Sequence, residues 1–242
     1  MGIFDRFRRK EQSPKRRSYA GVNTSRLFAD FSTMTRSSDA ELKPALRVLR
    51  NRCRELSRND EYVRRYLGLL KTNVVGPHGV NVQAKARNAD GSLDAPGNKI
   101  VENAWKAWGQ RGNCTVDGRL SWVDAQRLFI ETLARDGEVL VRFVNGYNNL
   151  ECFAIEFIEA DILDEELNTK ADNGNRIRMG VEVDDFGKAV AYHLLGEHPG
   201  DHEFVNSYSR KHVRVPADQM LHVSSCPKGH IRPVEYPCRR PP

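Results

Sequence analysis

The stretch "RELSRNDEYVRRYLGLLKTNVVGPHGV", residues 54–80, decides the fold, because a helical pattern gives way to an extended one within it. Between residues 62 and 70 apolar side chains recur at three- and four-residue steps, as on one face of a helix. Beyond Lys71 the apolar spacing alternates, and proline and glycine break the helical pattern. We therefore expect a helix that gives way to a strand, with a structural junction at Gly76, Pro77 and Gly79.

The residues before this junction predict two consecutive helices. Each has an apolar stripe expected to face inward, formed by Leu42, Ala45, Leu46, Leu49, Cys53 and Leu56, and then by Tyr62, Val63, Tyr66, Leu67 and Leu70. "SRND" separates the two stripes and offers Ser57 or Asn59 as a cap for the second helix. The arginines fall mostly off the stripes, so they are expected to coat a surface that faces solvent or an interface; they are Arg47, Arg50, Arg54, Arg58, Arg64 and Arg65.

Two further helices are expected before residue 138. "NKIVENAWKAWGQRG" reads as a helix that ends at Gly109 or Gly112, with Trp105 and Trp108 on one core-filling face. "SWVDAQRLFIETLARDG" begins with a capping-box pattern at Ser121 and can close at Gly137.

The chain becomes β-rich beyond residue 137. The expected strands are "EVLVRFV", "ECFAIEFI", "RIRMGVEVD", "KAVAYHLL" and "HVRVP", and "NGYNN" and "DDFG" are hairpin signals. Helices followed by a mostly antiparallel β-rich region predict the α+β class, with the helical part over 38–137 and the β-rich part over 138–223.

Length and composition narrow the class of protein. With 242 residues and 39% hydrophobic content, the chain can build one large core or two small ones. No apolar run approaches 18 residues, and the N-terminus "MGIFDRFRRK" lacks the apolar region of a secretory signal. Arg6 stands where an N-myristoylation motif needs Ser or Thr, so we expect a soluble, cytosolic protein.

The net charge of +6 is carried by the two ends of the chain. Residues 1–17 hold seven Lys/Arg against two Asp/Glu, and residues 226–242 hold four against one, which leaves the part between them at −2. Residues 1–24 contain few apolar groups and are expected to form a mobile basic arm, frayed in solvent or docking Ile3, Phe4 and Phe7 on a partner.

No cofactor or metal site is expected. Five widely spaced cysteines without a CxxC pair favour reduced thiols over disulfides. No phosphate-binding glycine loop and no GxSxG motif is present, and the scattered His193, His198, His202 and His212 favour ordinary surface or half-buried residues. The tail spacing of His222, Cys226, His230 and Cys238 only superficially resembles a zinc site.

A metal-dependent nuclease is one alternative function. The densest carboxylate cluster is Asp161, Asp164, Glu165 and Glu166, while Asp136 and Glu138 bracket a helix-to-strand turn. Divalent-metal phosphodiesterases need converging carboxylates. However, "EADILDEELN" has no Lys or His placed as a base. The simpler interpretation is an acidic surface exposed to solvent.

A DNA-binding module is the other alternative. Its candidate contacts are the basic residues of the N-terminal arm, namely Arg8, Arg9, Lys10, Lys15, Arg16 and Arg17. Such contacts would not read sequence and would weaken steeply with salt. The arginine-rich helices are poorer candidates, because Glu55, Asp60 and Glu61 interrupt their basic face.

The quoted stretch resembles the lambda-family phage portal proteins. The likeness continues in order through "AWKAWGQRG", "LARDGEVLVRF", "IEFIEADIL", "MGVEVDDFGKAVAYHLLGEHPGD" and "RVPADQMLHV". It covers roughly residues 38–223, and a portal-like body is assigned to residues 25–223. Each motif is weak alone, but six in the same order are specific.

The resemblance implies a homo-oligomeric ring of about twelve subunits at one capsid vertex of the virion, assembled in the host cytoplasm. It implies a major capsid or scaffold protein, a terminase and a head-completion protein as partners, with double-stranded DNA passing through without sequence specificity. It implies no catalytic residue, because ATP hydrolysis belongs to the terminase. The six helix arginines would then serve subunit interfaces, where guanidinium groups pair with carboxylates.

The tail departs from the family pattern. Portal proteins of this family are about twice as long, and after "MLHV" they continue with Pro-rich sequence that ends R-G-V-P. Read one base earlier, the codons of Val234 to Pro237 can spell those four residues. We therefore expect residues 224–242 to be an out-of-frame tail of a truncated, prophage-derived copy, with weak solubility or aberrant association.

Overall fold

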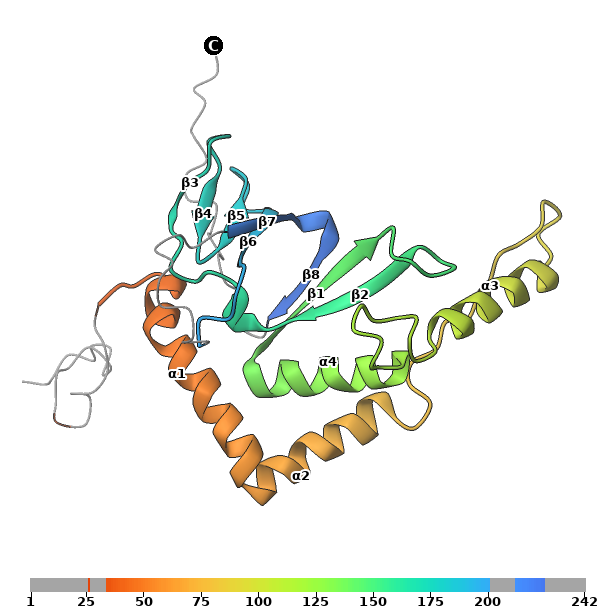
Figure 1. The fold of residues 1–242 in the computed structure, drawn as a ribbon, viewed down its shortest axis with the longest axis horizontal. Coiled ribbons are helices and arrows are strands. Elements are labelled where there is room, and N and C mark those ends of the chain that lie inside the picture. Colours follow the sequence, from red (N-terminus) through yellow and green to blue (C-terminus); the bar gives the residue numbers. More distant parts are fainter. Residues whose placement is uncertain (1–25, 27–33, 201–211, 225–242) are drawn as a thin grey trace, which may run out of the picture. The chain divides into compact units, whose positions relative to one another are not determined.

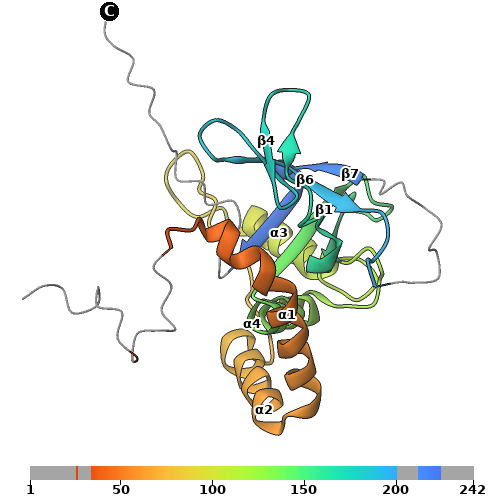
Figure 2. The ribbon, with the colours of Figure 1, turned by 90° about the vertical axis from the view of Figure 1, so that its left-hand side faces the viewer.

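The computed structural model describes residue 26 and residues 34–200 and 212–224. The chain divides into two units, Met1–Arg36 and Ser37–Pro242, and the fold given below is that of the second unit. Helices come first and strands follow, as Figures 1 and 2 show from two sides. The α+β prediction is confirmed. None of the helices described is long and apolar enough to cross a membrane.

The two arginine-rich helices are α1 (Ser38–Asn59) and α2 (Glu61–Leu70). Asp60 separates them, and its side chain accepts a hydrogen bond from the Val63 amide at 2.9 Å. The sequence predicted Ser57 or Asn59 as the N-cap of this helix, and the observed cap lies three residues or one residue later. A carboxylate at this position both caps the helix and complements its dipole.

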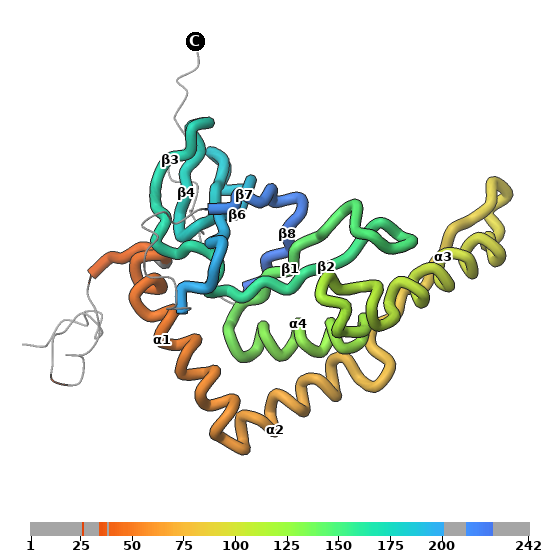
Figure 3. The backbone as a smooth tube through the Cα atoms, in the orientation of Figure 1, coloured from red at the N-terminus to blue at the C-terminus, as the bar shows by residue number. Residues whose placement is uncertain are grey.

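The junction after α2 is partly as predicted. α2 runs into a π-helical turn, Lys71–Val75, and Gly76 and Gly79 adopt φ values of 71° and 68°, which favour glycine. The strand predicted beyond it was wrong. Residues 77–94 contain no strand. After the turn at 76–78 the segment is extended to residue 88, and one bridge between Arg87 and Leu93 spans a second turn at 89–90; Figure 3 shows its course.

This extended segment is held by side chains of α4 instead of by a neighbouring strand. The Gln126 side chain accepts from the Val80 amide at 2.6 Å and donates to the Val80 carbonyl at 2.9 Å. Arg127 donates to the Gly76 carbonyl at 2.9 Å. The backbone groups of the segment thus find partners without a sheet.

The next two helices follow the sequence prediction closely. α3 spans Ala95–Trp108 and ends at Gly109, and α4 spans Trp122–Asp136 between the cap Ser121 and the left-handed Gly137. Trp105 and Trp108 pack with Trp122, with ring centroids 4.9 to 5.4 Å apart. α4 lies between the α1–α2 pair and the strands, so it joins the helical part to the sheet (Figure 1).

The strands form two antiparallel sheets. The first has the order β2-β1-β8, and the second has the order β3-β4-β5-β6-β7. The bounds are β1 Glu138–Asn145, β2 Phe153–Ile158, β3 Thr169–Lys170, β4 Arg176–Arg178, β5 Val181–Val183, β6 Ala189–Leu195, β7 His212–Pro216 and β8 Met220–Ser224, with 3-10 turns at Ala160–Ile162 and Ala217–Gln219. β8 was not predicted, and "RIRMGVEVD" is two strands because Met179 and Gly180 have positive φ.

Strand β1 is buried on both faces. Val139 and Val141 belong to a core cluster with Trp108 and Ala125, on the side of α4. Leu140, which points to the opposite face, packs in a second cluster with residues of β5, β6, β7 and β8. β1 is therefore central to both cores, and the acidic residues at and just before its N-terminal end, Glu138 and Asp136, are buried.

Candidate functional site

A buried arginine lies where α1 meets the sheets. Arg50 is 2% exposed. Its guanidinium donates to Asp161 at 2.6 Å, to Glu138 at 2.5 Å and to Glu165 at 2.7 Å. A buried charge is tolerated only when it is paired. Arg50 can therefore be buried here because these three carboxylates bind it.

Arg54, one helical turn further along α1, extends the same network. It donates to both oxygens of Asp136, at 3.2 and 2.9 Å, and to Asp161. Arg135 binds Asp136 from the other side at 2.8 and 3.1 Å. We call Arg50, Arg54, Asp136, Glu138, Asp161 and Glu165 the arginine network.

The arginines keep their partners ionised. Burial alone would raise the pKa of Asp136, but the hydrogen bonds and charges of Arg135 and Arg54 hold it below its usual range. Burial would likewise raise the pKa of Asp161, and Arg50 and Arg54 outweigh it in the same way. Both carboxylates are therefore anions at neutral pH, and each is neutralised within the chain.

The carboxylates singled out as a possible nuclease site are neither a solvated face nor an open metal site. Asp161, Asp164 and Glu165 are at most 9% exposed. Asp164 binds His212 at 2.5 Å, and only Glu166 is exposed, paired with Lys43 at 2.8 Å. The sequence missed this burial because the arginines that compensate the charge are more than 80 residues away in the chain.

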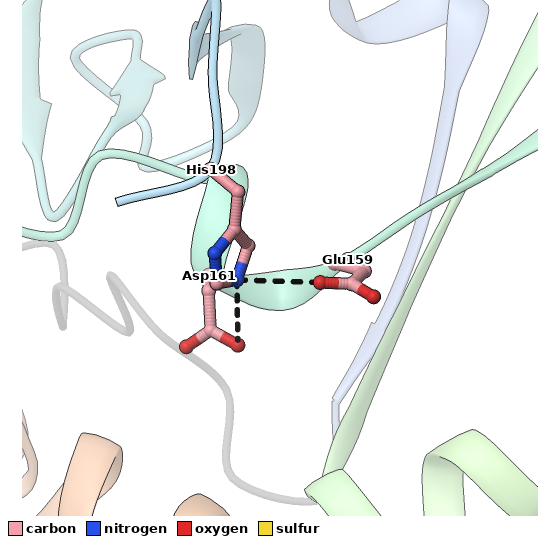
Figure 4. A group of neighbouring side chains, drawn as sticks. All are labelled: Glu159, Asp161 and His198. Atoms are coloured by element: carbon pink, nitrogen blue, oxygen red, sulfur yellow. Dashed lines mark ion pairs between the residues drawn. The ribbon is translucent and has the colours of Figure 1, made fainter. Parts of the chain in front are cut away.

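Glu159, Asp161 and His198 are the one group in the described residues with metal-ligand geometry, with ligand atoms within 4.8 Å of one another. Figure 4 shows His198 turned toward both carboxylates, at 3.3 Å from Glu159 and 3.9 Å from Asp161. However, the Asp161 oxygen that faces His198 also accepts from Arg54, and Arg50 binds the other oxygen. A cation there would compete with two guanidinium groups, so the donor set does not fit a metal ion.

Four of the five described histidines share one feature that the sequence did not indicate. Each of the four lies beside a carboxylate: His193 at 3.3 Å from Glu182, His198 beside Glu159, His212 beside Asp164, and His222 at 3.1 Å from Glu138. His212 of β7 and His222 of β8 thereby contact the acidic residues in or near the arginine network, whereas His193 of β6 contacts Glu182 of the neighbouring strand β5. His222 is thus engaged inside the fold, and the other residues of the tail spacing that superficially resembles a zinc site, Cys226, His230 and Cys238, lie outside the described residues, as does His202.

The predicted interface arginines fall into two groups. Arg50 and Arg54 lie in the arginine network, whereas Arg47, Arg58, Arg64 and Arg65 are exposed. The signal that could have separated them is the four-residue step Leu42, Leu46, Arg50, Arg54, which puts both buried arginines in line with apolar residues. Conversely, Leu49 is 52% and Tyr62 is 88% exposed, so the two apolar stripes predicted to face inward are only partly buried.

The remaining predicted site residues are placed as follows. Gly76, Pro77 and Gly79 lie at the end of α2, where Arg127 donates to the carbonyls of Gly76 and Pro77. The candidate DNA contacts Arg8, Arg9, Lys10, Lys15, Arg16 and Arg17 and the apolar Ile3, Phe4 and Phe7 lie outside the described residues.

Comparison with known proteins gives concordant results. A family model described as phage portal protein, lambda family, matches residues 24–226. A curated relative, described as a probable portal protein of Halomonas phage phiHAP-1, is 47% identical over 173 residues. These residues are 72% of this chain and 33% of the relative, so the match spans a third of the relative's length.

Proposed function

This chain belongs to the lambda family of phage portal proteins, and from this membership we propose that it is a structural subunit of a portal ring. Such a ring is the conduit at one capsid vertex through which DNA is packaged and ejected. The observation that carries the proposal is the family match, which spans nearly the whole described body. The proposal includes a non-enzymatic role, with a capsid or scaffold protein, a terminase and a head-completion protein as partners in the virion.

The distribution of charge supports contact between copies of the chain. Residues 37–75 carry nine Lys/Arg against five Asp/Glu, whereas residues 138–224 carry sixteen Asp/Glu against eight Lys/Arg. Arg50, Arg54 and the carboxylates they bind neutralise one another inside the subunit, so the charges left for the head-to-tail contact that closes a ring are the exposed ones, which on α1 and α2 include Arg47, Arg58 and Arg65.

The exposed arginines of α1 and α2 are the proposed basic side of this contact. Arg47, Arg58 and Arg65 have no ion pair to a described residue, and Arg64 reaches Glu61 only at 4.0 Å. Arg50 and Arg54 are not part of the proposed contact, because their guanidinium groups are bound within the subunit. The proposed interface set is therefore Arg47, Arg58, Arg64 and Arg65.

The proposal is tested by co-assembly. We would mix the chain with the full-length Halomonas phage relative and weigh the assemblies by native mass spectrometry. We expect the chain to enter the relative's rings, and we expect Arg58→Glu, Arg64→Glu and Arg65→Glu together to lower its incorporation by about tenfold or more.

The matched control reverses three exposed lysines away from α1 and α2, namely Lys85, Lys99 and Lys106. It makes the same change in net charge and is expected to leave incorporation intact. Absence of the wild-type chain from the rings would refute the ring function. Equal losses in the two triple variants would refute the arginine contact alone.

A further inference from the structure

A pocket of about 510 Å³ lies between α1, α4 and the strands β1 and β2. Part of its lining is apolar and comes from Leu128 of α4, Val139 of β1, and Phe157 and Ile158 of β2. The rest is mostly charged, with arginines from both helices. A pocket of this kind suits a ligand that joins an apolar group to an ionised one.

The charges in the lining leave one cation for a ligand. Three guanidinium groups line the pocket, those of Arg54, Arg58 and Arg135, against the carboxylates of Asp136 and Glu159. Arg54 and Arg135 both bind Asp136, and Glu159 pairs with a histidine of the same chain. Arg58 is exposed and forms no ion pair with a described residue. The pocket therefore suits a single carboxylate, which a guanidinium group can bind with two parallel hydrogen bonds.

The turn between β5 and β6 presents such a ligand. Phe186 is 87% exposed in this turn, and the side chain of the neighbouring Asp185 is exposed and forms no ion pair or hydrogen bond with a described residue. The Asp184 carboxylate fixes the turn, because it accepts from the Phe186 amide at 2.9 Å and from the Lys188 amide at 2.8 Å. Lys188 offsets the charge of Asp184, so the turn keeps the negative charge of Asp185 beside an exposed aromatic side chain.

This turn lies away from the pocket of its own subunit. β5 and β6 pack on the face of β1 opposite to α4, and Figures 1 and 2 show the β5–β6 hairpin on the far side of the three-stranded sheet from α4. A single exposed apolar residue is ordinary in itself. Here, however, the same chain carries a pocket of complementary charge and polarity, which the turn can reach only in another copy.

We propose that Asp185 and Phe186 of one copy bind in this pocket of the next copy, with the phenyl group on the apolar lining and the carboxylate on Arg58. The inference rests on the proposed portal ring and names the acidic partner of one of its arginines. Turn and pocket are different surfaces, so the contact is head-to-tail, the type that a ring repeats at every subunit. An aromatic anchor in a pocket, beside an arginine, is also typical of interface hot spots.

Other exposed apolar residues with an acidic neighbour are poorer occupants. Three of these carboxylates are already engaged: Asp94 caps α3, Glu102 accepts a hydrogen bond from the Ala84 amide, and one oxygen of Glu151 is buried. Glu55 and Glu61 lie in α1 and α2, where successive side chains point about 100° apart and do not enter one pocket together.

Photo-cross-linking tests which surfaces meet. Benzoylphenylalanine is placed at position 186 of the full chain, and this chain is mixed with isotopically heavy chain before irradiation. We expect mass spectrometry to find position 186 of the light chain linked to residues 128–135 or 157–159 of the heavy chain. Benzoylphenylalanine at position 150 is the control, because Leu150 is 97% exposed beside a different hairpin, and it should not label the pocket.

Sedimentation of the full chain tests the paired charges. Phe186→Ala, Asp185→Arg and Arg58→Glu should each weaken self-association by about tenfold. Because Asp185→Arg and Arg58→Glu exchange the two charges, the double variant should recover most of that loss. Leu150→Ala and Arg52→Glu are the matched controls, since both residues are exposed and neither lines the pocket, and they should leave association unchanged.

Three results would overturn the inference: no cross-link between light and heavy chains, a cross-link outside the pocket, or a double variant that associates no better than either single one. Retention of duplex DNA that Arg58→Glu abolishes, without the cross-link, would make a phosphate the ligand and equally overturn it. Entry of the chain into the relative's rings is measured separately. A chain that enters those rings without this cross-link refutes the pocket contact and leaves the ring proposal standing, whereas absence from the rings refutes the ring proposal.

Discussion

Arg50 gathers carboxylates from three separate places: Glu138 at the start of β1, Asp161 in the 3-10 turn after β2, and Glu165 just beyond it. Exposed ion pairs contribute little to stability, and loss of one member of a buried network is costly because the others remain charged. The single residue Arg50 therefore connects α1 to the β-rich part.

Replacement of Arg50 by leucine is expected to lower the free energy of unfolding by about 3–5 kcal/mol, because Glu138 and Glu165 would lose their buried guanidinium partner and Asp161 would keep only Arg54 of its two arginines. Denaturant unfolding followed by circular dichroism measures this change. Arg47→Leu on the same helix is the control, since Arg47 is exposed, and should change stability by less than about 0.5 kcal/mol. Equal effects of the two substitutions would contradict a central role for Arg50.

Acid should destabilise the fold through the same residues. The pKa values of Asp136 and Asp161 are held below the ordinary value in the folded chain, so the unfolded chain takes up protons first as the pH falls. Their contribution to stability is complete above the ordinary aspartate pKa of about 3.9 and is lost as the pH falls through the folded-state values.

Unfolding curves at several pH values between 7 and 2.5 test this expectation. Asp161→Asn should reduce the slope of stability against pH below about 4, whereas Asp172→Asn, at an exposed position, should not. An unchanged slope in Asp161→Asn would show that other carboxylates control acid unfolding.

At the scale of elements, the segment after α2 shows how a local pattern is overridden. Its alternating valines predicted a strand, but no neighbouring strand pairs with it, and Gln126 and Arg127 of α4 satisfy its backbone instead. The segment forms one wall of an apolar groove between α4 and the three-stranded sheet, so its attachment to α4 sets the width of that groove.

Gln126→Ala removes both hydrogen bonds to Val80 and is expected to cost about 1–3 kcal/mol. Faster hydrogen exchange and proteolysis within residues 76–83 would report release of the segment. Gln110→Ala is the control, because among the described residues the Gln110 side chain donates only to the Lys106 carbonyl, at the end of α3. If the amides of residues 76–83 exchange at the same rate in the two variants, Gln126 does not hold the segment on α4.

At the scale of the whole molecule, positive and negative charges are separated between the helical and β-rich parts. Between the two basic ends of the chain the net charge is −2. In the portal ring proposed above, a body with no net positive charge would let DNA slide without gripping it.

The sequence by itself determined the class and most of the elements, although it missed β3 and β8 and predicted a strand after α2 that does not form. Caps and glycines at Ser121, Gly109 and Gly137 placed the helix ends, and alternation with the "DDFG" turn placed the hairpin of β5 and β6, because these signals act between residues near in the chain. The ordered motifs also indicated the family that the comparisons found.

Only the tertiary structure decided which charged residues are buried and which apolar residues are exposed. Arg50 is inside because three carboxylates 88 to 115 residues away converge on it, and no local spacing encodes that convergence. Leu221 and Val80 are exposed for the complementary reason, since no described element covers the groove they line. Burial depends on partners distant in sequence, and those partners meet only in the folded chain.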